Sequence, residues 1–268
     1  MRKMPKVKNL IAALPEPEQI DLDALRRSLE DGSVELVCVL GPTASGKTRY
    51  AVQLARALGS GAEIISADSR QVYRRMDIGT GKDLAEYGEV PYHLIDIAEP
   101  GTQYNVYRFR EDFFRAYEDI RSRGGIPILC GGTGLYISAV TGGYDFKTKK
   151  PLSAVAQEPL ADAPKTFFIG TLVSREVRNA RIDARLDARL QEGMVDEIRG
   201  LLDSGVPAET LISYGLEYKF VTLYLTGQMD YAAMREHLAI AIHQFAKRQM
   251  TWFRGMERSG ITIHWVEV

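Results

Sequence analysis

The sequence predicts an α/β protein with a parallel sheet flanked by helices on both faces and a helical C-terminal half. From residue 34 to residue 172, short apolar runs alternate with amphipathic stretches. The runs are continuously apolar rather than alternating with polar residues, which is typical of parallel strands buried on both faces. Beyond residue 174, apolar residues recur at helical spacing. These three observations define the fold class.

Composition restricts the function classes. The chain has 268 residues, of which 45% are hydrophobic and 26% charged, enough for one sizeable core. The formal net charge of -1 gives no bulk attraction to nucleic acid, so a polyanionic partner must be bound by a local basic patch. Since no apolar stretch approaches the roughly 18 residues of a membrane span, we expect a cytoplasmic protein without a membrane partner.

The two cysteines, Cys38 and Cys130, each lie near the end of an apolar run. We expect both to be buried free thiols. Two cysteines are too few for a disulfide framework or a cysteine metal site, and the histidines show no metal-ligand spacing.

Residues 1–33 are predicted to be an appendage to a domain formed by residues 34–268. This segment has a basic start, a Pro-Glu-Pro sequence and a short amphipathic helix, "LDALRRSLEDG", that ends at Gly32. We assign no chemistry to it.

Five largely apolar segments of six or seven residues are expected to form strands. They are "VELVCVL" (34–40), "AEIISA" (62–67), "YHLIDI" (92–97), "IPILCG" (126–131) and "TFFIGTL" (166–172). A helix over 48–58 is predicted to end at Gly59, and a longer helix over 106–123 to end at the Gly124–Gly125 pair.

Residues 141–164 contain Gly, Lys and Pro without periodicity and are predicted to form a surface linker. Three further helices are expected at 175–202, 214–226 and 231–254. The alternating run "ITIHWVEV" at the end is predicted to add an edge strand.

A phosphate-binding loop follows the first expected strand. The stretch "GPTASGKT" fits the pattern G-x-x-x-x-G-K-[ST] between a strand and a helix, so the sheet is predicted to be P-loop NTPase-like. Its backbone N–H groups can converge on phosphate oxygens, while Lys47 adds a positive charge and Thr48 a hydroxyl ligand for Mg²⁺. The predicted phosphate-binding residues are Gly41, Pro42, Thr43, Ala44, Ser45, Gly46, Lys47 and Thr48. A kinase or NTPase is the default function of such a loop.

Polar residues follow the second expected strand. In "IISADSRQVYRRMDIGTGK", Asp68, Ser69 and Gln71 come directly after the apolar run. Ligands of open α/β sheets bind at this carboxyl edge, so the carboxylate of Asp68 is expected to face the bound phosphates. The residue type alone leaves three roles open for Asp68: a Mg²⁺ ligand through water, a general base, or a cap of the following turn.

Five motifs in order resemble the tRNA dimethylallyltransferases, which attach an isopentenyl group to an adenine beside the anticodon. They are "GPTASGKT", "ISADSRQVYRRMDIGTGK", "PYHLIDI", "GGTGLYI" and "AKRQMTWFR". The resemblance implies that the loop holds the diphosphate of dimethylallyl diphosphate together with Mg²⁺. The loop would then stabilise a leaving group.

The resemblance also assigns roles to single residues. Asp68 matches the general base that takes a proton from the adenine N6 amine. Ser69, Arg70 and Gln71 match a segment that contacts the nucleotide, and Thr133 matches a residue that touches the RNA. A strand-to-helix turn is the alternative role of the glycine cluster around Thr133.

His93 and Asp96 in "YHLIDI" match the family as well. We expect these two side chains to form a structural hydrogen-bonded pair.

Arginines recur along one helix. In "SREVRNARIDARLDARL" they form a stripe beside Ile182 and Leu186, at positions Arg178, Arg181, Arg185 and Arg189. The stripe is either a salt-bridged surface or a set of phosphate ligands. The resemblance implies that one arginine of this helix holds the diphosphate, and Arg181 matches best, with Arg185 as the substitute.

The last helix combines charged and aromatic residues near its end. These are Lys247, Arg248, Trp252 and Arg254, and they either contact the RNA backbone or, for Trp252, pack in the core.

The sequence departs from the family in one interval. Typical members carry a helical insertion before the strand that resembles "TFFIGTL", and only residues 141–164 stand there in this chain. We expect transfer of a dimethylallyl group to the N6 amine of an adenine, in tRNA next to the anticodon. The alternatives are prenylation of a free adenine nucleotide, a P-loop kinase or NTPase, and a non-catalytic nucleotide- or RNA-binding protein.

Overall fold

A six-stranded parallel sheet in the order β3-β2-β4-β1-β7-β8 forms the centre of the computed structural model. The structure describes residues 15–59, 61–142, 144–145, 150–151 and 163–268. The strands of the sheet are β1 (Leu36–Leu40), β2 (Ala62–Ser66), β3 (Tyr92–His93), β4 (Ile126–Gly131), β7 (Thr166–Leu172) and β8 (Ile263–Glu267). Between α4 and β7 in the sequence, β5 (Tyr144–Asp145) and β6 (Lys150–Pro151) pair as a separate two-stranded antiparallel sheet.

Both faces of the sheet are covered, as predicted. In β1, Leu36, Cys38 and Leu40 belong to one hydrophobic core, whereas Val37 and Val39 belong to the other. Burial of both faces explains why the strands are continuously apolar. The α/β fold class predicted from the sequence is confirmed, and Cys38 and Cys130 are buried free thiols, as expected.

Two sets of helices form the outer layers. Helices α1 (Leu22–Glu30) and α2 (Lys47–Leu58) pack on the face that includes Val37. Helices α3 (Val106–Ser122), α4 (Gly134–Val140) and α9 (Tyr231–Arg258) contribute to the core on the opposite face. The structure is therefore a three-layer arrangement around the sheet.

The N-terminal segment joins this arrangement through α1. The Asp21 side chain caps the helix by accepting the N–H groups of Asp23 and Ala24. Leu25 and Leu29 are buried in the core shared with α2. Residues 1–14 of the predicted appendage lie outside the described residues, and the domain boundary after residue 33 stays a prediction.

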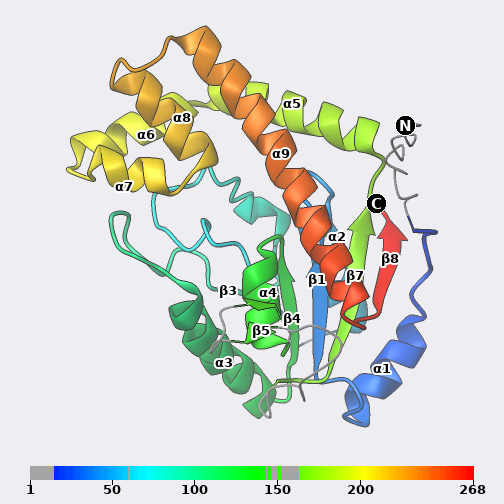
Figure 1. The fold of residues 1–268 in the computed structure, drawn as a ribbon. Helices are drawn as coiled ribbons and strands as arrows, with labels where there is room; N and C mark the ends of the chain where they lie inside the picture. Colours follow the sequence, from blue (N-terminus) through cyan, green and yellow to red (C-terminus); the bar gives the residue numbers. More distant parts are fainter. Residues whose placement is uncertain (1–14, 60, 143, 146–149, 152–162) are drawn as a thin grey trace, which may run out of the picture.

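The helical half lies beyond the carboxyl edge of the sheet (Figure 1). It consists of α5 (Arg175–Glu192), α6 (Met194–Asp203), α7 (Ala208–Ser213) and α8 (Leu216–Leu225), and α9 returns from it to the sheet. The single helix predicted over 175–202 is two helices, because Gly193 has a φ of 104° and interrupts the α conformation.

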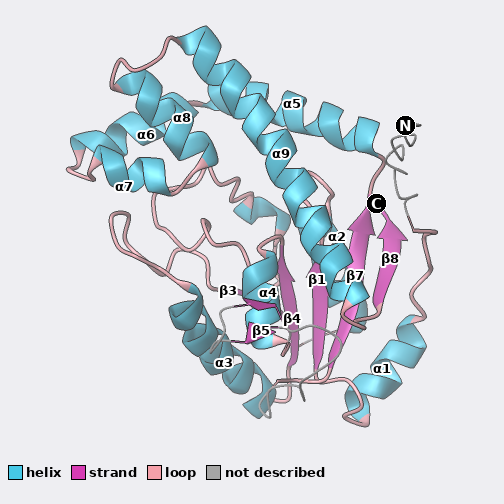
Figure 2. Ribbon diagram, viewed as in Figure 1, coloured by secondary structure: helices cyan, strands magenta, loops and turns pink. Residues whose placement is uncertain are grey.

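Two predicted strands have informative outcomes. The run 92–97 forms a strand only at Tyr92–His93, because Leu94 and Asp96 adopt φ values of 63° and 56° and turn the chain into a loop (Figure 2). The predicted edge strand at the end of the chain is confirmed as β8, which pairs parallel to β7.

The topology creates a site at the carboxyl edge. Neighbouring strands β1 and β4 continue in opposite directions, because β1 leads to β2 on one side and β4 leads to β7 on the other. Such a switch point leaves a crevice between the connections, and ligands of open α/β sheets bind there.

Candidate active site

The phosphate loop connects β1 to α2 and is shaped by its backbone. Ala44 and Gly46 have φ values of 61° and 81°, which turn the chain before the first helical residue, Lys47. Gly41 packs against the hydroxyl of Thr171, and a Cβ atom there would overlap it. Ser45 and Thr171 share a hydrogen bond of 2.6 Å between their hydroxyl groups, so Ser45 anchors the loop to β7.

A polar cavity lies beside this loop, and we call it the central cavity. It brings together residues that are far apart in the sequence. The predicted site residues that line it are Thr43, Ala44, Gly46, Lys47, Thr48, Asp68, Arg70 and Gln71. Gly41, Pro42, Ser45, Ser69, Thr133 and Arg181 are not among its lining residues.

Asp68 and Lys47 face the same cavity. Asp68 Oδ1 accepts the backbone N–H of Arg70 at 3.0 Å, which orients the carboxylate through the turn after β2. The Nζ of Lys47 lies 3.5 Å from the carbonyl oxygen of Pro42. Burial lowers the pKa of Lys47, and the negative charge of Asp68 opposes this shift. A bound anion would likewise raise the pKa of Lys47 and favour its charged form.

Ser69 and Thr133 are hydrogen-bonded to each other and do not line the central cavity. The N–H of Ser69 donates to Thr133 Oγ1 at 3.1 Å, and the N–H of Thr133 donates to the carbonyl of Ala67 at 3.2 Å. Thr133 is also the N-cap residue of α4. The second glycine cluster is therefore joined to the segment after β2, and an RNA contact by Thr133 stays a prediction.

Gln71 lines the central cavity with its amide already bonded. Its Nε2 donates to the carbonyl of Gly81 at 3.2 Å, and its Oε1 accepts from Ser66 at 3.3 Å. These two hydrogen bonds connect the end of β2, at Ser66, with Gly81 in the loop that leads to β3.

Only part of the arginine stripe reaches the cavity. Arg185 and Arg189 line it, whereas Arg181 is exposed on α5. Arg185 pairs with the carboxylate of Asp83 and contacts the carbonyl of Gly81 at 3.4 Å. The diphosphate-binding role of Arg181 stays a prediction. Four-residue spacing identifies the stripe, but it does not determine which end of α5 lies over the cavity.

Two functional candidates were missed from the sequence. Gln249 of α9 is 7% exposed, accepts the N–H of Thr43 at 2.8 Å and donates to the carbonyl of Gly132 at 2.9 Å. A buried glutamine on an otherwise apolar helix face was the available signal. Glu217, in the first turn of α8, is buried and pairs with Arg70 and Arg189. No local pattern links it to those arginines.

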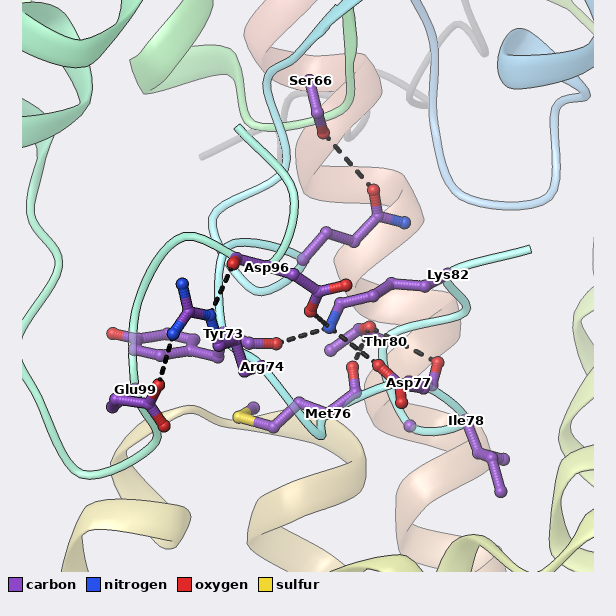
Figure 3. A network of polar contacts seen from close by, with 12 residues as sticks. Ser66, Tyr73, Arg74, Met76, Asp77, Ile78, Thr80, Lys82, Asp96 and Glu99 are labelled. Carbon is purple, nitrogen blue, oxygen red and sulfur yellow. Dashed lines mark hydrogen bonds and ion pairs between the residues drawn. The ribbon is translucent and has the colours of Figure 1, made fainter. Parts of the chain in front are cut away.

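A buried lysine holds the loop between β2 and β3. The Lys82 side chain is fully buried and donates to the carbonyl of Tyr73 and to the carboxylates of Asp77 and Asp96, as Figure 3 shows. Because Gly81 precedes Lys82, this anchor also places the carbonyl that Gln71 contacts.

The predicted pair between His93 and Asp96 is wrong. His93 Nε2 lies 2.7 Å from Glu63 Oε2 on β2, and Asp96 binds Lys82 instead. The positive φ angles at Leu94 and Asp96 turn the chain between the two side chains, so they face different partners.

The charged and aromatic residues of α9 have mixed roles. Trp252 Nε1 donates to Ser138 at 3.1 Å, and a Cβ atom on Gly134 would overlap the indole ring, so Trp252 packs against α4. Arg254 binds Glu257 at 2.9 Å. Lys247 and Arg248 are exposed, and their contact with RNA stays a prediction.

Neither a metal cluster nor a membrane span is found in the described part of the chain. No group of three or more His, Cys, Asp or Glu side chains there is arranged to hold a metal ion. None of the helices in these ranges combines the length and the apolarity needed to cross a bilayer.

A parallel α/β sheet, a phosphate loop after its first strand and a polar cavity at its carboxyl edge define a P-loop protein. The sequence matches a family model described as IPP transferase over residues 71–162 and 146–256, and one described as Isopentenyl transferase over residues 34–89. The chain belongs to the tRNA dimethylallyltransferase family, as the resemblance predicted.

Curated relatives and solved structures agree with this assignment. The tRNA dimethylallyltransferase 1 of Parabacteroides distasonis is 49% identical over 287 residues, covering 88% of this chain and 93% of that protein. The tRNA dimethylallyltransferase 1 of Porphyromonas gingivalis is 49% identical, with 87% and 93% covered. The tRNA isopentenylpyrophosphate transferase of Bacillus halodurans is 31% identical with a TM-score of 0.74, covering 87% of this chain and 89% of that one.

The chain lacks residues that the Parabacteroides distasonis relative has. The match to the Parabacteroides distasonis protein extends over 287 positions, although only 88% of the 268 residues of this chain take part. The relative therefore has several tens of residues without a counterpart here. The two parts of the IPP transferase match meet within residues 146–162, inside the interval predicted to be short.

Proposed function

We propose that this chain transfers the dimethylallyl group of dimethylallyl diphosphate to the N6 amine of an adenine in tRNA, next to the anticodon. The observation that supports the proposal is the shared cavity of Lys47 in the phosphate loop and Asp68 after β2. The cavity offers cations and N–H groups to a leaving diphosphate and a carboxylate to an attacking amine.

The phosphate loop stabilises the leaving group in this proposal. Breaking the allylic C–O bond places an additional negative charge on the diphosphate. The backbone of Thr43, Ala44 and Gly46 and the ammonium of Lys47 surround this position. Arg185 lines the same cavity and adds a second cation. These groups are in place before the bond breaks, so little reorganisation is needed.

Asp68 accepts the proton of the acceptor amine. Its Oδ1 is held by the N–H of Arg70, while Oδ2 accepts no hydrogen bond from the described residues. The carboxylate is therefore oriented and retains an oxygen for the adenine N6 proton. Ser69, Arg70, Gln71 and Thr133 are proposed to position the adenine or its ribose-phosphate.

Mg²⁺ fits the chemistry of this cavity. The hydroxyl of Thr48 and the carboxylate of Asp68 both line it and are hard oxygen donors of the kind that Mg²⁺ prefers. Thr48 would hold the ion. When bound, the ion would neutralise charge on the diphosphate.

A free adenine nucleotide is the second candidate acceptor, and the short interval predicted at residues 141–164 favours it. The relative from Parabacteroides distasonis has residues without a counterpart in this chain. A smaller protein surface for the RNA would bind a stem-loop less tightly, while a nucleotide does not depend on that surface. The names of the relatives favour tRNA.

An acceptor assay distinguishes the two. The protein is incubated with labelled dimethylallyl diphosphate, Mg²⁺ and either bulk tRNA or AMP, and the label is located by mass spectrometry. We expect N6-dimethylallyladenine in tRNA. Label in AMP alone would overturn the tRNA acceptor, and no label in either would overturn the transferase function. The Asp187→Asn variant, which removes a surface ion pair with Arg235, should give the same distribution of label as wild type.

A further inference from the structure

The guanidinium of Arg189 is enclosed in the wall of the central cavity without a hydrogen-bond partner. Its side chain is only 12% exposed, and its nearest carboxylate oxygen, Glu217 Oε1, lies 3.7 Å away. This separation is an ion pair but is too long for a hydrogen bond. Within the ranges that the structure describes, no group accepts a hydrogen bond from this guanidinium.

Positive charge is crowded around Arg189. Arg185 and Arg70 line the same cavity, and the Arg185 and Arg189 guanidinium groups converge on Gly81, where a Cβ atom would overlap Arg189. Burial lowers the pKa of Arg189 to about 10, and the charge of Arg185 adds to this effect. An arginine so placed is stabilised by any anion that enters the cavity.

Glu217 forms an ion pair with two of these arginines. Its side chain is 4% exposed, and it pairs with Arg70 through Oε2 and with Arg189 through Oε1. The carboxylate lies in the first turn of α8, after Leu216, whose φ of 42° is unusual for a residue other than glycine. Glu217 carries one negative charge against the two positive charges of Arg70 and Arg189, and the other acidic residues that line the cavity are Asp68, Asp83 and Glu86.

We infer that Arg189 is a phosphate-binding residue of the central cavity and that Glu217 is the counter-ion that holds it in place before the ligand binds. This inference rests on the proposed function and deepens it. The ligand is recognised by its phosphate oxygens, which a planar guanidinium can bind in a bidentate manner. They belong either to the diphosphate of the donor or to the phosphate of the acceptor nucleotide.

Binding calorimetry of the full chain tests this inference without any transfer reaction. Inorganic pyrophosphate and AMP are titrated separately, with Mg²⁺ present, into wild type and the Arg189→Met variant. We expect the variant to bind pyrophosphate about 10- to 100-fold more weakly, which corresponds to one charged hydrogen-bonded contact. Weaker binding of AMP alone would assign Arg189 to the acceptor phosphate instead. Unchanged affinity for both anions would overturn the inference.

The Glu217→Gln variant tests the counter-ion role with a change of opposite sign. The glutamine keeps the shape of the side chain but no longer neutralises Arg70 and Arg189, so pyrophosphate should bind a few-fold more tightly. Added salt should reduce this gain in affinity. Weaker binding by this variant, in protein whose thermal unfolding remains cooperative, would overturn the counter-ion role. Arg235→Met and Asp187→Asn, which break an exposed ion pair between α9 and α5, should leave both affinities unchanged.

The outcomes separate this inference from the proposed function. If wild type transfers the dimethylallyl group but Arg189→Met binds both anions normally, only the inference fails. If wild type transfers nothing to any adenine acceptor but Arg189→Met loses pyrophosphate affinity, the proposed function fails and the anion site stands.

Discussion

Gln249 Oε1 accepts the backbone N–H of Thr43 at 2.8 Å and thereby connects α9, the last helix, to the phosphate loop. The same amide donates to the carbonyl of Gly132 at 2.9 Å. One buried side chain thus joins the loop after β1 to the glycine cluster after β4. The shape of the loop depends on a residue more than two hundred positions away in the sequence.

Replacing Gln249 with Leu should loosen this connection. The N–H of Thr43 and the carbonyl of Gly132 would lose their partner, so the free energy of unfolding should fall by about 1–3 kcal/mol. The KM for dimethylallyl diphosphate should rise more than kcat falls. Urea unfolding and steady-state kinetics measure both effects. Gln244→Leu, at an exposed position of the same helix, is the control, and equal KM values for the two variants would contradict this role.

Asp68→Asn should separate binding from chemistry. An amide cannot take the proton of the acceptor amine, so kcat should fall by about 10²- to 10⁴-fold. Affinity for dimethylallyl diphosphate should change little, because the amide oxygen can still accept the Arg70 N–H. Single-turnover transfer and equilibrium binding are the measurements. A variant that retains most of the wild-type rate would exclude Asp68 as the general base.

Lys82→Met should destabilise the loop between β2 and β3. The ammonium has three oxygen partners, and its removal leaves the Tyr73 carbonyl and the Asp96 carboxylate without it. Because the Asp77 and Asp96 side chains are 59% and 36% exposed, water takes over part of this role, and we expect a loss of about 1–3 kcal/mol in the free energy of unfolding. Chemical unfolding measures it, beside Lys165→Met at an exposed position. Equal losses in the two variants would show that Lys82 is not a structural anchor.

Local patterns predicted the parts of the site that are contiguous in the sequence. The strand before Gly41 and the helix after Gly46 determine where the loop lies in the sheet, so a short motif was enough to identify it. Asp68 was found for the same reason, because it follows a buried strand at the ligand-binding edge. Most helices and strands were likewise predicted, but Gly193 divides the helix expected over 175–202 and the strand expected over 92–97 is confined to Tyr92–His93.

Long-range partners could not be predicted in this way. Glu217 and Gln249 reach the cavity because α8 lies beyond the carboxyl edge of the sheet and α9 returns from there to the sheet. Nothing near these residues in the sequence indicates what they bind. Arg181 is exposed because of the way α5 lies over the cavity, and the spacing of residues along a helix does not determine this orientation. The predicted pairing of His93 with Asp96 is wrong because left-handed residues, Leu94 and Asp96 itself, turn the chain so that the two side chains meet different partners.

Acid should weaken the fold partly through Glu63. The ion pair with Arg123 and the contact with His93 hold the pKa of this carboxyl below its ordinary value of 4.5, although burial opposes the shift. A carboxyl whose pKa is lower in the folded state stabilises the fold above its unfolded pKa and loses this contribution as the pH falls through the folded value. Glu63→Gln should therefore be less stable than wild type at pH 7, and the difference should shrink as the pH drops below about 4.5. Urea midpoints of both proteins at neutral and acidic pH measure this convergence, with the exposed Glu111→Gln as the control. A difference that stays constant with pH would show that Glu63 contributes by packing rather than by its charge.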